Sequence, residues 1–127
     1  MQRFTELKVW QRSHALTLAI YRCSTSFPDA ERFGITAQLR RAAFSVPTNI
    51  AEGSKRRTST EYARFLNIAE GSMAEVEYLL LLSRDLGYLA QKPSAPLLAE
   101  ASEILRMLNS LRSKVLEGSR PARIDSE

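Results

Sequence analysis

Few side chains in this sequence have the type and spacing that chemistry requires. His14 is the single histidine and Cys23 the single cysteine. A di-metal carboxylate bundle needs Glu-x-x-His from two helices, and no histidine follows Glu52, Glu70 or Glu75 at that spacing. The sequence also has no glycine-rich phosphate loop and no local Ser-His-Asp or Cys-His set. We therefore expect no enzymatic activity, no metal and no cofactor.

The remaining candidate is a basic run, Ser54-Lys55-Arg56-Arg57, in the connection before the longest expected helix. Lysine and arginine displace counterions along a nucleic-acid backbone, and the amides at a helix N-terminus also attract phosphate. Residues 32–64 carry a net charge of +5, against +1 for 1–31 and −2 for 65–127. No aromatic residue interrupts the run, so we expect contact through charge and shape rather than base stacking. The alternative is a solvated loop cluster without a ligand.

Four stretches with helical periodicity must position these residues. The expected helices run from about residue 6 to 26, from 35 or 36 through Pro47, from about 58 to 86, and from Ser94 to about 117. A capping box, Thr58-x-x-Glu61, opens the third, and Gly87 is its expected left-handed stop. Because short connections favour antiparallel neighbours, the sequence predicts an all-α, antiparallel up-down-up-down four-helix bundle.

The composition is that of one globular domain. Its 127 residues are 44% hydrophobic and 25% charged, which suits a single hydrophobic core. We expect the bundle to occupy residues 1–117 and a flexible tail to occupy 118–127. No apolar run approaches the ~20 residues that span a bilayer, there is no secretory signal, and one cysteine cannot form an internal disulfide. These features predict a cytoplasmic protein without membrane attachment.

A proline inside the second helix raises the question of what repairs the backbone. Pro47 removes an amide that would bond the carbonyl of Ala43, at a cost of ~3 kcal/mol unless a bend and other donors compensate. The apolar spacing continues beyond Pro47, so we expect the helix to bend and resume. In this interpretation Ser45 and Asn49 satisfy the freed carbonyls. A binding site built on the bend is the alternative.

A polar network is expected around this bend. Glu75 of the third helix lies within an apolar stripe, and a buried carboxylate requires a partner, for which Arg41 or Arg40 is available. The residues expected to form the network are Arg41, Ser45, Asn49, Glu52 and Glu75.

The third helix carries more apolar surface than a small bundle needs. Beside its core stripe lies a second stripe, whose candidate subunit-interface residues are Ile68, Leu79, Leu82 and Leu86. Large exposed apolar patches are uncommon on monomers, so this surplus predicts a homo-oligomer. The alternative is a wide core face covered by Trp10 and Tyr21 of the first helix.

The same segments resemble a known bacterial family. The stretches FTELKVWQRSHAL, GITAQLRRAAFSVPTNIAEGSKR and EYARFLNIAEGSMAEVEYLL are similar to the four-helix bundle proteins encoded in intervening sequences of 23S ribosomal RNA genes, also labelled S23 ribosomal proteins. The similarity covers roughly residues 4–90. It implies a ring-shaped homopentamer of antiparallel four-helix bundles with no known enzymatic activity. The ribosomal label implies location in a ribosomal RNA gene more than membership of the ribosome.

That family is similar to the accessory variability determinant of diversity-generating retroelements, a basic pentamer that works with a reverse transcriptase and RNA. By this analogy, together with the charge pattern, the candidate nucleic-acid contacts are Arg40, Arg41, Lys55, Arg56, Arg57 and Arg64. We therefore expect a non-enzymatic oligomer that binds structured RNA or another nucleic acid through a basic surface. The alternative is a protein–protein interaction scaffold with no nucleic-acid role.

Overall fold

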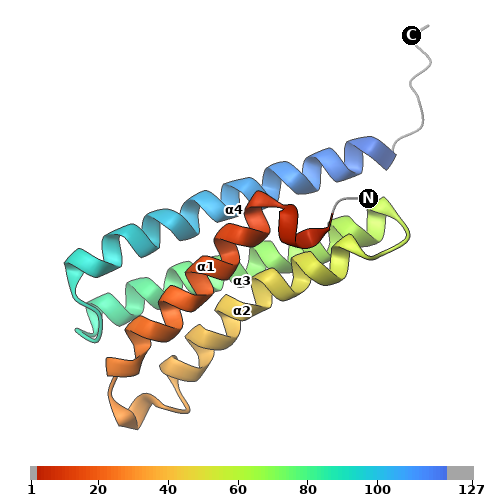
Figure 1. Cartoon of the computed structure of the whole chain (residues 1–127). Helices are drawn as coiled ribbons and strands as arrows, with labels where there is room; N and C mark the ends of the chain where they lie inside the picture. The colour runs from red at the N-terminus through yellow and green to blue at the C-terminus, as the bar shows by residue number, and fades with distance from the viewer. Residues whose placement is uncertain (1–2, 120–127) are drawn as a thin grey trace, which may run out of the picture.

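The computed structural model describes residues 3–119, which form four long α-helices and no strand. The helices are α1 (Lys8–Cys23), α2 (Ile35–Ser54), α3 (Ser59–Asp85) and α4 (Gln91–Ser119). Short 3-10 turns precede α1 (Phe4–Glu6) and connect it to α2 (Ser24–Ser26 and Asp29–Glu31). Figure 1 shows that successive helices run in opposite directions along one bundle. The predicted all-α, four-helix architecture is confirmed.

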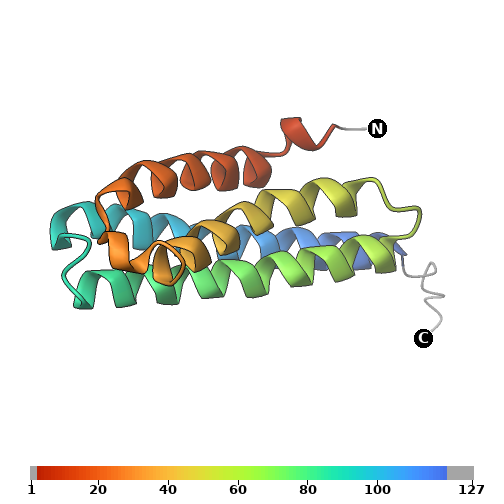
Figure 2. The same ribbon diagram turned by 90° about the horizontal axis from the view of Figure 1, so that it is seen from below.

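The core lies where the apolar stripes of the four helices meet. Figure 2 shows α1 lying across one side of the layer that the other helices form. The largest aliphatic side chains that are fully buried are Ile20, Leu39, Val46, Ile50, Leu66, Val76, Leu80, Ile104 and Leu108. Each such side chain contributes about 1.5–3 kcal/mol when it leaves water. The periodicity of the sequence therefore determines which face of each helix turns inward.

Two local signals set the ends of α3. The hydroxyl of Thr58 accepts a hydrogen bond from the amide of Glu61 at 3.1 Å, as a helix N-cap does. At the other end Gly87 has a φ of 81°, a conformation that glycine adopts without a steric penalty. Of the predicted capping box, the bond from the Glu61 amide to Thr58 is present, and the predicted left-handed stop at Gly87 is confirmed.

The beginning of α4 differs from the prediction. The helix starts at Gln91 rather than Ser94, because Pro93 lies in the first turn, where its missing amide costs no hydrogen bond. At its other end α4 continues through Ser119, so the first two residues of the predicted 118–127 tail are helical. The rest of that segment, 120–127, lies outside the described residues. Between residues 3 and 119, no helix is both long and apolar enough to cross a membrane.

The second helix runs through Pro47 without interruption. The carbonyl of Ala43, which Pro47 leaves without an amide partner, lies 3.1 Å from the hydroxyl of Thr17 in α1, which donates to it. Asn49 instead donates to the carbonyl and hydroxyl oxygens of Ser45, at 2.8 and 3.1 Å. The expected repair by Ser45 and Asn49 is therefore wrong, because those side chains lie on the side of α2 that faces α3, whereas the freed carbonyl faces α1.

Candidate nucleic-acid interface

The basic run occupies one end of the bundle. Helix α2 ends at Ser54, and the amides of Lys55 and Arg56 bond the carbonyls of Glu52 and Gly53 at 3.2 and 3.0 Å. The turn packs beside the start of the chain and the last turns of α4. A pocket of 350 Å³ lies at this meeting point, and its lining includes Leu7, Arg56, Arg57, Thr58, Tyr62 and Leu111.

The cations at this end carry no ion pair within the described part of the chain. Lys55, Arg56, Arg57 and Arg64 are all exposed, and none of them contacts a carboxylate within 4.0 Å. The arginines that do form ion pairs lie elsewhere: Arg12, Arg41, Arg84, Arg106 and Arg112. The positive charge of Lys55, Arg56, Arg57 and Arg64 is not neutralised by a carboxylate, so it remains available to a polyanion. We call the four unpaired residues, Lys55, Arg56, Arg57 and Arg64, the basic end.

Aromatic rings lie beneath three of these cations. The guanidinium groups of Arg56 and Arg64 lie 5.3 and 4.9 Å from the ring centroid of Phe65. The ammonium group of Lys55 lies 5.7 Å from the ring centroid of Phe4. Although the basic run itself contains no aromatic residue, aromatic rings therefore lie beside it in the folded structure. Phe65 follows Arg64 directly in the sequence, whereas Phe4 is distant from Lys55 and nothing in the sequence around Lys55 indicates it.

Arg40 and Arg41 do not join the basic end. They precede Lys55 by about 15 residues of helix, or about 22 Å at the standard rise. Arg40 donates to the hydroxyl of Ser24 and the carbonyl of Tyr21, at 2.8 and 3.1 Å. Its neighbour Arg41 points toward α3 instead, because consecutive helical residues are 100° apart. The six predicted contact residues are thus not one patch: four are clustered at the basic end, and the other two lie apart.

The expected polar network is only partly assembled. Arg41 lies 3.9 Å from Glu75, and the hydroxyls of Ser45 and Ser72 lie 2.9 Å apart between α2 and α3. The side chain of Glu75 is 42% exposed, so the expectation of a buried carboxylate is wrong. Glu52 is exposed, and in the described structure its side chain bonds no member of the network.

The more buried carboxylate is one that the pattern did not identify. The side chain of Glu70 is 16% exposed and pairs with Arg112, linking α3 to α4. This hydrogen bond raises the pKa of Arg112. A second interhelical pair joins Arg12 of α1 to Glu100 of α4 through two hydrogen bonds of 2.8 and 2.6 Å. The bond from Arg12 lowers the pKa of Glu100. Both pairs join α4 to a neighbouring helix.

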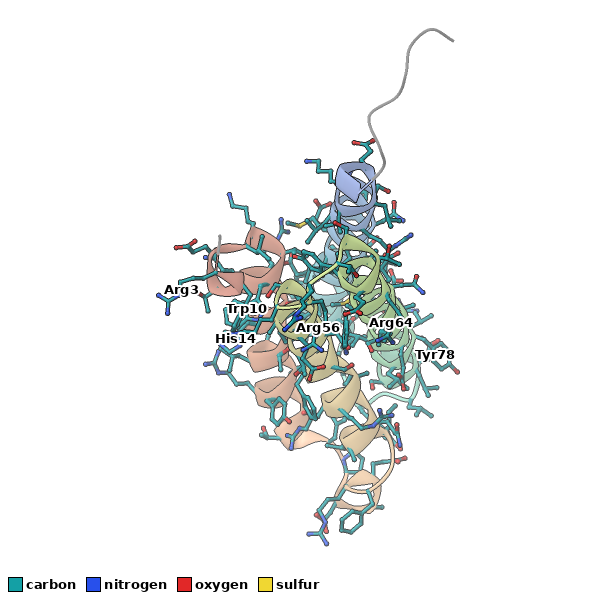
Figure 3. The ribbon with its side chains drawn as sticks, turned by 90° about the vertical axis from the view of Figure 1, so that its right-hand side faces the viewer. Arg3, Trp10, His14, Arg56, Arg64 and Tyr78 are labelled. Carbon is teal, nitrogen blue, oxygen red and sulfur yellow. The ribbon has the colours of Figure 1, made fainter. Side chains whose placement is uncertain are left out.

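The candidate interface residues on α3 divide into two pairs. Leu79 and Leu82 are half-buried and pack against the core, so a single chain already covers much of their surface. Ile68 and Leu86 are 41% and 50% exposed. Tyr78, on the outward side of α3, is also exposed (Figure 3). The apolar surplus of α3 is therefore smaller than the sequence indicates.

His14 and Cys23 have ordinary packing environments. The imidazole of His14 stacks on Trp10, with ring centroids 5.0 Å apart. Burial raises the pKa of the Cys23 thiol, which keeps it protonated at neutral pH. Across residues 3–119, no group of three or more histidine, cysteine or acidic side chains is placed to hold a metal ion.

Comparison with known proteins identifies the family. No curated protein matches the sequence. Among solved structures, a protein of unknown function from the S23 ribosomal protein family of Bacteroides thetaiotaomicron has the same fold, with a TM-score of 0.74 and 23% identity. The similarity covers 82% of this chain and 97% of that one. The family model for the 23S rRNA-intervening sequence protein matches residues 5–110. This chain therefore belongs to the 23S rRNA-intervening sequence protein family.

Proposed function

We propose that this protein is a non-enzymatic nucleic-acid-binding protein whose ligand is structured RNA. The observation that carries the proposal is the basic end, where Lys55, Arg56, Arg57 and Arg64 lie together without ion pairs. Cations that have no carboxylate partner gain most from contact with phosphates, because they release the counterions condensed on the nucleic acid. The N-terminus of α3, which begins two residues after Arg57, adds a favourable dipole.

The salt dependence of binding tests this proposal. The probe is a labelled RNA hairpin, and its dissociation constant is measured by fluorescence anisotropy over a range of salt concentrations. We expect the triple variant Lys55→Ala, Arg56→Ala and Arg57→Ala to reduce the slope of log Kd against log salt by about 2–3. The matched control removes the same charge elsewhere, with Arg22→Ala, Arg41→Ala and Arg106→Ala. Equal effects of the two triple variants would reject the basic end as the contact.

We further propose that the chain acts as a homo-oligomer, a ring of five copies as the family resemblance implies. Exposed Ile68 and Leu86 on α3 support an apolar contact between copies. The combined variant Ile68→Glu and Leu86→Glu is expected to lower the native mass to that of one chain without lowering helicity, whereas Leu18→Glu on exposed α1 surface leaves it unchanged. In a ring the basic end recurs around the axis, and weak contacts then add up. A native mass of one chain for the unaltered protein contradicts this assembly.

The same apolar surface supports one other function, that of a scaffold for a different protein. Exposed Tyr78 extends the surface beyond the residues proposed for self-association. In that case purification after nuclease treatment retains a protein partner and no nucleic acid. The triple variant of the basic end then retains the partner.

A further inference from the structure

Beside the basic end, a groove lined mainly by apolar side chains runs between the start of the chain and α2. Its volume is 470 Å³, and its lining includes Phe4, Trp10, His14, Phe44 and Pro47. The ring of Phe4 meets that of Trp10 edge to face at a centroid distance of 5.2 Å. Trp10 in turn stacks on His14 with only 10° between the ring planes. Figure 3 shows Trp10 and His14 together on α1, on the side of Arg56 opposite Arg64.

The core accounts for only part of this aromatic cluster, because Trp10 packs against it while other rings of the cluster remain exposed. Phe44 is 45% exposed, although it sits on a helix whose other face supplies several fully buried residues. His14 is exposed as well, and Trp10 is only half-buried. The groove therefore presents ring surfaces of Phe44 and His14 to solvent. Such surfaces are typical of sites that receive a planar or apolar group.

The charges around the groove indicate which group that is. Lys55, a member of the basic end, lies over the ring of Phe4, so the groove opens next to a cation. Arg3, directly before Phe4, is exposed and lies on the same side of the molecule as Trp10 and His14 (Figure 3). Glu52 also lines the groove, and its carboxylate only accepts hydrogen bonds, as the exocyclic amino groups of bases require. A ligand with a flat apolar face, amino donors at its edge and an attached anion satisfies all three features.

We propose that this groove holds an unpaired base of the bound RNA, with the adjoining phosphate against Lys55. The inference rests on the proposed function and adds the form of RNA that is recognised. Bases in a duplex are stacked internally and cannot enter the groove, whereas bases in loops, bulges and single strands stack on aromatic side chains. The protein therefore binds phosphates at the basic end and distinguishes unpaired from paired RNA at the groove.

Trp10 is the single tryptophan of the chain, so its fluorescence reports on the groove directly. The probes are single-stranded oligoadenylate, a blunt RNA duplex of the same length, and heparin, a polyanion without bases. All three are expected to bind at low salt, and only the single strand is expected to quench Trp10 after correction for absorbance. Equal quenching by all three, or none by the single strand, overturns the proposal while leaving phosphate binding in place. Failure of all three to bind overturns both this inference and the proposed function.

Two exposed phenylalanines provide a matched pair of variants. Phe44→Ala removes a wall of the groove and is expected to weaken single-strand binding at least about fivefold, the lower range for loss of one stacked base. Duplex and heparin binding should be unchanged. Phe33→Ala removes a ring that is 83% exposed, two residues before the start of α2, and is expected to alter none of the three. His14→Ala provides a second variant if Phe44→Ala folds poorly, and equal single-strand affinity for all three variants contradicts the proposal.

Discussion

The hydroxyl of Thr17 lies 3.1 Å from the carbonyl of Ala43, the backbone acceptor that Pro47 deprives of its amide. The same hydroxyl lies 2.8 Å from the carbonyl of Ser13 in its own helix, but that carbonyl already has a helical amide within reach. Thr17 is buried, so no water replaces it. One side chain of α1 thus supplies the donor that allows a proline in the interior of α2.

The Thr17–Ala43 bond predicts a measurable coupling between two helices. Thr17→Val keeps the side-chain shape but leaves the Ala43 carbonyl without a donor, which should lower the free energy of unfolding by about 1–3 kcal/mol. Pro47→Ala restores the amide, so in that background Thr17→Val should cost less than half as much. Chemical denaturation of the four proteins in a double-mutant cycle measures the difference. An equal cost in both backgrounds would show that Thr17 does not act through this carbonyl.

This bond also shows how far the sequence alone could predict the fold. Periodicity assigns a core face to each helix, and local signals such as Thr58 and Gly87 set helix ends, because both depend on neighbours within one or two turns. Neither signal determines how far α1 is shifted along its axis relative to α2, and so which residues of the two helices meet. Thr17 and Ala43 are 26 residues apart, so a donor from the same helix was the natural but incorrect expectation.

The candidate site shows the same limit. The basic run could be identified from composition, since Lys55, Arg56 and Arg57 are adjacent in the chain. The ring of Phe4 beneath Lys55 could not be identified in this way. Phe4 lies before the N-terminus of α1 and meets Lys55 only in the folded chain. The prediction that Arg40 lies on the same surface as Lys55 is wrong for the converse reason. Arg40 is near Lys55 in sequence, but the helix places it several turns away.

A second prediction concerns the close approach of α2 and α3. A Cβ atom added at Gly53 would lie 2.8 Å from the Cβ of Phe65 and 3.0 Å from Cδ1 of Tyr62, so Gly53→Ala should lower the free energy of unfolding by about 1–3 kcal/mol. Gly71 in α3 is the matched control, because a Cβ there meets nothing within 4 Å. Gly71→Ala should raise stability by up to about 1 kcal/mol through helix propensity alone. Thermal unfolding of the two variants measures both effects, and a change of the same sign in both contradicts the packing argument.

Two carboxylates of α3, Glu70 and Glu75, should differ in their contribution to stability. Glu70→Ala removes the partially buried partner of Arg112 and is expected to cost about 1 kcal/mol or more, because charge-assisted hydrogen bonds at such sites are among the stronger ones. Glu75→Ala breaks a contact of 3.9 Å at an exposed position, where ion pairs are worth a few tenths of a kcal/mol at most. Urea denaturation at neutral pH compares the two. A larger loss of unfolding free energy in the Glu75 variant would show that the α2–α3 carboxylate contributes more to stability than the α3–α4 one, contrary to this prediction.

The Arg12–Glu100 pair predicts a specific loss of stability in acid. Because the hydrogen bond from Arg12 lowers the pKa of Glu100 below its ordinary value of 4.5, the folded state binds this proton less readily than the unfolded state. The pair therefore contributes fully above that ordinary value, and its contribution falls as the pH drops through the lower, folded-state pKa. Both side chains are about one-third exposed, so solvent screening limits the contribution to about 1 kcal/mol.

The variant Glu100→Gln isolates this effect, because glutamine does not titrate and forms no ion pair. The stability advantage of the unaltered protein over the variant should be largest near about pH 7 and should shrink as the pH approaches about 3. Urea denaturation at a series of pH values gives this difference directly. Glu103→Gln is the control, since its carboxylate pairs with Arg106 three residues along the same helix and acts on Arg12 only through a smaller charge effect than the hydrogen bond of Glu100. If the advantage over Glu100→Gln is constant across the whole series, the pair does not stabilise the contact between α1 and α4 through its charge.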